Sequence, residues 1–171
     1  MKRLKIYGFF LVFLLTAFSI TISTSYAESI SQSGLPLPRF VSLRFQRVNL
    51  RSGPGTRYPV KWVYLKIGLP VEVITEFDNW RLVRDWEGTE GWMHQSTLSG
   101  RRMIRITGVE RNLRNSPAED SPLVAKLEAG VIGKLLQCPR DSMFCRVEVN
   151  NYHGWLKRGE FWGVYPGEHI D

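Results

Sequence analysis

The chain alternates short apolar runs with clusters of turn-forming residues along most of its length. After residue 27, the runs are rich in β-branched and aromatic side chains and are separated by Gly, Pro, Asn and Asp. This pattern predicts short β-strands, and no stretch keeps the 3.6-residue apolar spacing of a long helix. One 3₁₀ turn is expected in HQSTL, before a last short strand. The expected strands lie in FVSLRFQRVNLR, VKWVYL, PVEVITEF, NWRLVRDW and EGWMH, and then in MIRITGVERNLR, LVAKL, GKLLQC, FCRVEV and YHGWL.

The two sets of strands belong to two copies of one sequence unit. NLRSGPGTRYPV at residues 49–60 returns as NLRNSPAEDSPL at residues 112–123, an offset of 63. So many coincidences at one spacing indicate a duplicated module, and each copy predicts a small all-β barrel. Units of about 60 residues are marginally stable alone, so we expect the copies to pack on each other through the linker at residues 99–110. The same offset, within one residue, relates Leu65 to Leu127, Gly68 to Gly130, Trp80 to Phe144, and Gly91-Trp92 to Gly154-Trp155.

The N-terminus has the three-part organisation of a secretory signal peptide. MKRLK is basic, residues 6–22 are apolar, and the small residues Ser25 and Ala27 precede a predicted cut between Ala27 and Glu28. The alternative is an uncleaved anchor, but a helix over residues 6–22 would be only about 26 Å long, against roughly 30 Å of hydrocarbon. Any contact with the membrane is therefore expected only through this segment, if it stays uncleaved.

Removal of residues 1–27 changes the charge, because Lys2, Arg3 and Lys5 lie there and no acid does. The remaining chain has 20 basic and 16 acidic side chains. Residues 28–111 have 13 basic and 8 acidic groups, whereas residues 112–171 have 7 and 8. The electropositive first half suits anionic envelope components, and nucleic acid is an unsuitable partner for an exported protein. An ordinary solvated surface is the alternative explanation.

The glycine-rich loop RSGPGTRYP is not expected to bind phosphate. Pro54 removes one backbone N–H, and no Lys-Ser/Thr pair follows the last glycine. Gly53 and Gly55 are expected to permit the backbone angles of a turn in the first copy alone, because the second copy has Ser116 and Ala118 there.

The two cysteines, Cys138 and Cys145, predict a disulfide in an exported protein. In the alignment of the copies they correspond to Glu76 and Arg81. We therefore expect the same hairpin to be closed by an exposed cross-strand ion pair in the first copy and by a disulfide in the second.

No catalytic, metal or cofactor site is predicted. His94 and His153 do not occupy equivalent positions in the two copies, and oxidised cysteines leave no thiolate beside either histidine. Two cysteines without further Cys/His spacing do not make a zinc site. The sequence therefore predicts a binding protein rather than an enzyme.

The first copy contains the segments NLRSGPGTRYPV, GLPVEVI, DNWRLVR and EGTEGWMHQSTLSG. These segments resemble the bacterial SH3-like domain, and the NLR and GW positions of the second copy resemble a divergent one. The whole chain is similar to the exported tandem SH3-domain proteins of alphaproteobacteria. The resemblance implies an all-β fold of two tandem SH3-like barrels. It also implies binding of cell-wall peptidoglycan, or contacts with other proteins, in the periplasm. The expected segments are a signal peptide (1–27), an extended tail (28–39), the first barrel (40–102), the second barrel (103–165) and a C-terminal tail (166–171).

Aromatic and basic side chains of the first copy are the candidates for ligand binding. Trp86 has no aligned partner and lies in a polar, turn-rich segment, where a large aromatic side chain supplies contact area or folds back on its own barrel. Tyr58 and Trp62 are further candidates, with Arg57 and Arg84 available for carboxylates. The expected partner is peptidoglycan or another anionic envelope component; the alternative is an extended peptide of an envelope protein. The proline-bearing LPLPRF at residues 35–40 is expected to be a spacer or, alternatively, a cover for a barrel.

Overall fold

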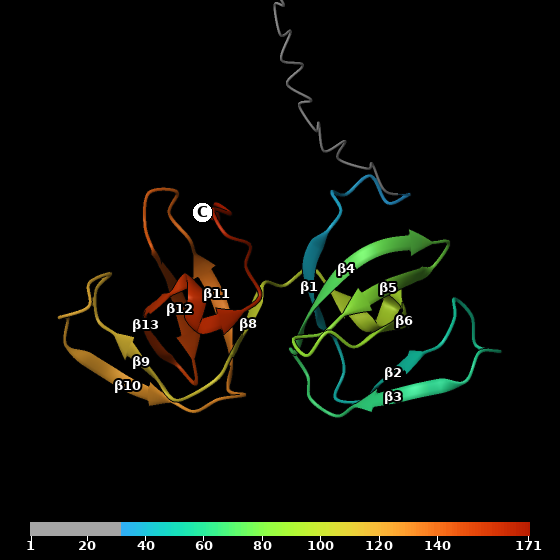
Figure 1. Cartoon of the computed structure of the whole chain (residues 1–171), viewed down its shortest axis with the longest axis horizontal. Coiled ribbons are helices and arrows are strands. Elements are labelled where there is room, and N and C mark those ends of the chain that lie inside the picture. Colours follow the sequence, from blue (N-terminus) through green and yellow to red (C-terminus); the bar gives the residue numbers. More distant parts are fainter. Residues whose placement is uncertain (1–31) are drawn as a thin grey trace, which may run out of the picture.

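The computed structural model describes residues 32–171, and in this part the chain is all β (Figure 1). Two antiparallel sheets of seven strands follow one another along the chain, each around its own apolar core. We call them the first barrel (β1–β7) and the second barrel (β8–β14). The first has β1 Arg39–Leu43, β2 Val48–Arg51, β3 Val60–Tyr64, β4 Pro70–Phe77, β5 Trp80–Arg84, β6 Glu90–His94 and β7 Leu98–Ser99. The second has β8 Met103–Ile106, β9 Arg111–Arg114, β10 Leu123–Leu127, β11 Ile132–Gln137, β12 Phe144–Val149, β13 Tyr152–Lys157 and β14 Phe161–Trp162.

The two barrels have the same topology, which confirms the tandem all-β fold. The strand order is β3-β2-β6-β5-β4-β1-β7 in one sheet and β10-β9-β13-β12-β11-β8-β14 in the other. A 3₁₀ helix precedes the last strand of each barrel, η1 Gln95–Thr97 and η2 Arg158–Glu160, and the first of these confirms the turn expected in HQSTL. Figure 1 shows the barrels side by side, joined by the short segment between β7 and β8.

The glycine of each GW pair is required by close packing. A Cβ on Gly91 would lie 2.5 Å from Cγ of Leu50, and one on Gly154 would lie 2.6 Å from Cγ of Leu113. Both leucines are fully buried. The Leu of NLR and the Gly of GW therefore recur together, because the leucine side chain occupies the space that a Cβ on the glycine would need in each core.

The arginine of each NLR motif fastens the loop that follows it. Nη1 of Arg51 donates to the carbonyl oxygens of Thr56 at 3.0 Å and Tyr58 at 2.7 Å. Nη1 of Arg114 donates to the carbonyl oxygen of Ser121 at 2.8 Å. Since a guanidinium has several donors in a fixed plane, a single arginine side chain can hydrogen-bond the backbone carbonyl oxygens of the loop in each copy.

The glycines of the first loop have a different role from the one expected. Neither Gly53 nor Gly55 has a positive φ, so the expectation that they permit special backbone angles is wrong. Instead, the Tyr58 ring lies against Gly53, where a Cβ would be 2.5 Å from Cδ1 of the ring. In the second loop Ser116 and Ser121 stand at these positions and their hydroxyls hydrogen-bond at 2.8 Å. Gly53 therefore makes room for an aromatic side chain.

Equivalent hairpins in the two barrels are closed by different chemistry. Cys138 and Cys145 form the predicted disulfide. Glu76 and Arg81 face each other across β4 and β5, with Oε1 and Nε 3.0 Å apart. The ion pair is thus confirmed, but its expected exposure is wrong: the Glu76 side chain is 1% exposed and Arg81 is 7% exposed. Nη2 of Arg39 also contacts Glu76 Oε1, at 2.6 Å, and covers the pair.

The segment that precedes β1 lies on the first barrel. The backbone N–H and the hydroxyl of Ser33 donate to the Glu76 carboxylate at 2.9 and 2.8 Å. Leu37 packs against the core of the first barrel. Residues 32–38 therefore cover part of their own barrel. The predicted signal peptide and cut site at Ala27 and Glu28 lie outside the described residues.

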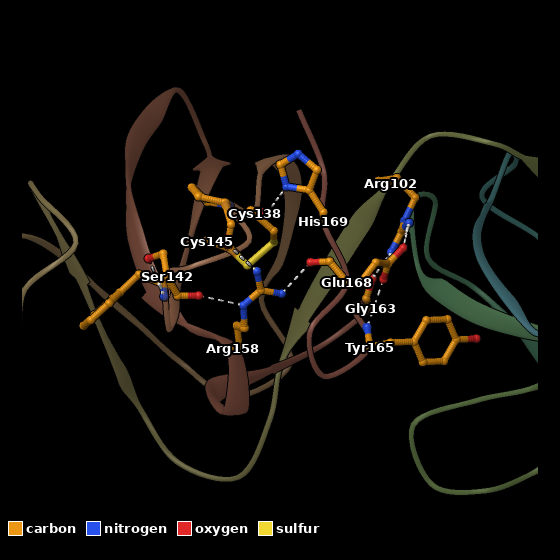
Figure 2. The surroundings of a disulfide bond; sticks show 11 residues. Arg102, Cys138, Ser142, Cys145, Arg158, Gly163, Tyr165, Glu168 and His169 are labelled. Atoms are coloured by element: carbon orange, nitrogen blue, oxygen red, sulfur yellow. Dashed lines mark hydrogen bonds and ion pairs between the residues drawn. A yellow bond between two sulfur atoms is a disulfide. The ribbon is translucent and has the colours of Figure 1, made fainter. Parts of the chain in front are cut away.

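The C-terminal segment ties the second barrel to the first. Figure 2 shows this segment running past the disulfide, with Arg158 donating to the carbonyl oxygen of Glu168 at 2.7 Å. The Glu168 carboxylate contacts Arg102 of the linker, and the Tyr165 hydroxyl donates to Oε1 of Glu72 on β4 at 2.9 Å. These contacts connect the end of the second barrel to the linker and to the first barrel.

Aromatic packing adds to the contact between the barrels. The Phe40 ring of β1 meets Trp162 edge-on at 5.0 Å between centroids and Tyr165 at 4.6 Å. The two barrels therefore pack on each other, as expected for units this small.

Candidate functional site

The candidate site is a cleft of about 590 Å³ between the two barrels. Trp62 on β3, Leu65 and Lys66 after it, and Trp86 after β5 form the side of the first barrel. Arg105 on β8 and the turn from Glu128 to Val131 form the side of the second barrel. The cleft is therefore shared, and neither barrel has it alone.

Trp86 is held by a buried polar pair beneath it. The Tyr64 hydroxyl donates to Oδ2 of Asp85 at 2.7 Å, and both residues are buried. Oδ1 of Asp85 accepts from the backbone N–H groups of Glu87 and Thr89, each at 2.9 Å, and so shapes the loop that carries Trp86. Burial, followed by the hydrogen bond to Asp85, raises the pKa of Tyr64, so the phenol remains a donor.

Arg105 covers one face of Trp86. Its guanidinium carbon lies 4.0 Å from the centre of the Trp86 ring, a close cation–π contact, while the Tyr64 ring meets Trp86 edge-on at 6.5 Å. Burial lowers the pKa of Arg105, and the nearby carboxylates of Glu87 and Asp85 act in the opposite direction. Trp86 therefore packs against its own barrel and also carries a cation from the other one.

Trp62 is the open aromatic surface of the cleft. It lies on β3, an edge strand of the first sheet, and is 59% exposed. Lys66 reaches across the cleft, where Nζ donates to the carbonyl oxygen of Gly130 at 3.0 Å. The cleft thus combines an accessible indole with cations from both barrels and the single carboxylate of Glu128.

Two matches to one family model show which protein family the chain belongs to. The model described as the bacterial SH3 domain matches twice, at residues 45–100 and at residues 107–163. The chain belongs to the bacterial SH3 domain family. Both copies are SH3 domains, including the second, in which GPG has become SPA.

Some solved structures resemble the tandem SH3 domains at low identity. NlpC2 from Trichomonas vaginalis is 15% identical with a TM-score of 0.34, over 78% of this chain and 50% of that one. NlpC1 from the same organism is 16% identical with a TM-score of 0.34, over 87% and 53%. An NlpC/P60 family protein from Bacillus cereus is 16% identical with a TM-score of 0.32, over 71% and 55%. The chain thus spans about half the length of these proteins. No curated protein matches its sequence.

Of the five predicted ligand-binding residues, the structure brings two together. Trp62 and Trp86 line the same cleft of the tandem SH3 domains. Arg57 and Tyr58 lie in the β2–β3 loop, where the Arg57 guanidinium sits 5.2 Å from the centre of the Tyr58 ring. Arg84 is engaged with Glu90 at 2.7 Å and Glu72 at 3.3 Å. These three residues do not line the cleft.

The charged residues of the cleft, Arg105, Lys66 and Glu128, were not predicted from the sequence, and Arg105 is the one in contact with Trp86. It lies at the start of the second SH3 domain, in the segment interpreted as linker and first strand, and its partner Trp86 belongs to the first domain. A local pattern does not reveal such a contact, because it depends on how the two domains pack.

The second SH3 domain does not repeat this site. The strand register matches Leu127 with Tyr64, so the predicted match of Leu127 with Leu65 is wrong by one residue. With the offset of 64, Val149 replaces Asp85 and Asn150 replaces Trp86. Leu127 and Val149 belong to the apolar core of the second domain, so the polar pair is replaced by apolar packing. The first domain alone supplies the two tryptophans.

Within residues 32–171, no group of three His, Cys, Asp or Glu side chains could hold a metal ion, and no helix is long and apolar enough to cross a membrane. Both cysteines are in the disulfide and are fully buried. Domains of the bacterial SH3 family are typically modules that bind the cell wall.

Proposed function

We propose that the protein is a non-enzymatic module of the cell envelope that binds peptidoglycan in the cleft between its two SH3 domains. The observation that carries this proposal is the exposed Trp62 in a cleft that also contains cations from both domains. Aromatic faces supply rigid contact area for sugars and peptides, and the cations suit an anionic polymer. The typical cell-wall binding of the family supports the same conclusion.

Export to the periplasm is part of the proposal. It rests on the predicted signal peptide and agrees with a buried disulfide, which persists in an oxidising compartment. The exported chain is expected to begin at Glu28, which intact-protein mass spectrometry would test. A mass that retains residues 1–27 would show an uncleaved anchor instead.

Co-sedimentation with purified sacculi tests the binding function. The wild-type protein is expected to pellet with sacculi at low salt and less at high salt, since the cleft cations are screened. Trp62→Ala should reduce pelleting at least fivefold. Phe77→Ala is the matched control, because Phe77 is an aromatic residue of the same domain, 57% exposed, that does not line the cleft. Equal loss in both variants, or no pelleting of the wild type, would contradict the proposal.

One observation favours a second candidate function, an adaptor that binds an extended peptide of an envelope protein. Among the strands of residues 32–171, β3 pairs with β2 alone, so its other edge has backbone groups available to a further strand. In that case sacculi would not pellet the protein at low salt, and crosslinking would recover a protein partner through β3. Turnover of sacculi by this chain alone would contradict both functions and indicate an enzyme.

A further inference from the structure

Arg105 is one of the arginines of residues 32–171 whose side chain has few hydrogen-bond partners. Its one hydrogen bond is from Nη1 to the carbonyl oxygen of Ile106, at 3.4 Å, and within residues 32–171 it forms no ion pair. Most of its N–H donors therefore have no protein acceptor in this part of the chain. Arginines that donate to carboxylates or carbonyl oxygens at 3.0 Å or less are Arg39, Arg51, Arg81, Arg84, Arg102, Arg114 and Arg158.

The plane of Arg105 is nevertheless fixed. The guanidinium stacks on Trp86, which is held in turn by its edge-on contact with Tyr64 and by the Asp85 turn. Stacking leaves the in-plane N–H groups of an arginine available, and these match the two oxygens of a carboxylate. Arg105 is thus a positioned cation whose donors remain unused.

This arrangement changes the role of the two tryptophans. Because Arg105 covers one face of Trp86, that face is closed to a sugar ring, and Trp86 acts as a positioning residue for Arg105. Trp62 keeps its exposed ring for the apolar part of a ligand. The cleft therefore pairs one open indole with one oriented guanidinium.

The charges on the cleft wall limit the kind of anion. Arg105 and Lys66 supply two positive charges, and Glu128 supplies one negative charge. Glu87 is exposed and close enough to Arg105 to affect its pKa. A polymer with a charge on every unit would be repelled by Glu128 and Glu87, whereas a single carboxylate can pair with Arg105 directly.

We propose that Arg105 binds a carboxylate of the peptide part of peptidoglycan, so that the cleft recognises the peptide rather than the glycan. This inference rests on the proposed binding function and names the ligand class for the same cleft. The peptide carboxylate pairs with the guanidinium of Arg105, and the neighbouring apolar groups of the peptide pack on Trp62 and Leu65.

Calorimetric titration with disaccharide-peptides released from sacculi by a muramidase tests this ligand class. One sample has free peptide carboxylates, and in the other the carboxylates are converted to N-methylamides. The wild type is expected to bind the acid form at least tenfold more tightly than the amide form. Arg105→Gln should abolish this preference. Arg101→Gln is the matched control, because Arg101 is exposed, loses the same charge and does not line the cleft.

Two further variants separate the possible outcomes. Arg105→Lys keeps the charge without the planar pair of donors, so it should keep a severalfold preference for the acid form even if Arg105→Gln does not fold. Trp62→Ala should weaken both forms by the same factor. Equal binding of acid and amide by the wild type would overturn the inference and leave the binding function standing. No binding of fragments or sacculi by the wild type would overturn both.

Discussion

The hairpins β4–β5 and β11–β12 occupy the same place in the two SH3 domains but are closed by different chemistry. In the first domain the Glu76 carboxylate lies between Arg81 and Arg39, and in the second Cys138 is bonded to Cys145. Each closure also holds a chain segment from outside the repeat. Glu76 accepts hydrogen bonds from Ser33, and the backbone of Cys138 pairs with Ile170. In both domains the connection at this hairpin therefore also fastens a terminal segment.

The largest expected effect comes from removing the carboxylate of the first hairpin. Glu76→Ala leaves the largely buried cations of Arg81 and Arg39 without a carboxylate, which should lower the free energy of unfolding by about 3–5 kcal/mol. Urea denaturation of the full chain measures this loss. Glu110→Ala is the control, since its pair with Lys126 is exposed and should contribute less than about 1 kcal/mol. Equal losses would show that burial of the first pair does not matter.

The same carboxylate should give the protein an acid-sensitive stability. Burial raises the pKa of Glu76, but hydrogen bonds from Arg39 and Ser33 and the charge of Arg81 more than offset this and hold the pKa at about 2. Because the folded-state pKa lies below the ordinary value of 4.5, the stabilisation is complete above about pH 4.5 and is lost as the pH falls towards 2. Urea midpoints over this range should fall more steeply for the wild type than for Glu76→Gln.

The next largest effect is expected at the second hairpin. Replacing both cysteines by alanine opens a loop of about eight residues, for which chain entropy predicts a loss of at most about 2.5 kcal/mol. The C-terminal segment should loosen as well, because the Cys138 backbone pairs with Ile170. Hydrogen exchange of the Ile170 amide, with urea denaturation, measures both effects. Two reactive thiols in the native, unreduced protein would contradict the disulfide.

A smaller effect should distinguish the two loops that follow the NLR motifs. Gly53→Ala places a Cβ against the Tyr58 ring and should cost about 1–2 kcal/mol, which thermal unfolding can measure. Adding Tyr58→Ser copies the small side chains of the second loop and should recover most of this loss. Gly55→Ala should be close to neutral, since Gly55 has no positive φ and Ala118 stands there in the second domain. A large loss of stability in Gly55→Ala would instead support the original prediction that these glycines are needed for their backbone angles.

The smallest effect is expected at an ion pair of the first sheet. Glu72, Arg84 and Glu90 form a row across this sheet, and Lys134, Glu148 and His153 form the corresponding row across the second. Arg84→Ala should cost about 1 kcal/mol by urea denaturation, because its pair with Glu90 is exposed and the buried Glu72 keeps its hydrogen bond from Tyr165. It should also leave sacculus binding unchanged, since Arg84 does not line the cleft. Loss of binding in this variant would move the ligand site to the outer surface of the first domain.

Local packing explains why so much of the fold could be predicted from the sequence. The close packing of Leu50 on Gly91, and of Leu113 on Gly154, leaves no room for a Cβ at either glycine. Both copies therefore keep the same leucine and glycine at the same spacing, and the repeat can be recognised in the sequence. The hairpin closures followed from the same alignment. The burial of Glu76 did not, because Arg39 on β1 and Ser33 before it reach it from residues that precede the aligned motifs.

The candidate site was less predictable for a related reason. Trp62 and Trp86 stood out as aromatic residues without a clear framework role, but nothing local connects Trp86 to Arg105. That contact depends on the packing of the two domains. The packing involves Tyr165 with Glu72 and Arg102 with Glu168, four residues scattered over the chain.

The contacts that the C-terminal segment makes with the linker and the first domain could be removed by proteolysis. Tyr165 and Glu168 join the domains from a short stretch that follows the last strand, and this stretch is held by Arg158 and the Cys138 backbone. A protease that cuts after Gly163 and releases the segment would remove Tyr165 and Glu168 from the contact between the domains, and Val164 and Ile170 from the second core. The contacts of Phe40 with Trp162 and of Arg105 with Trp86 would remain. A single nick near the C-terminus would thus weaken the packing of the domains that shapes the cleft.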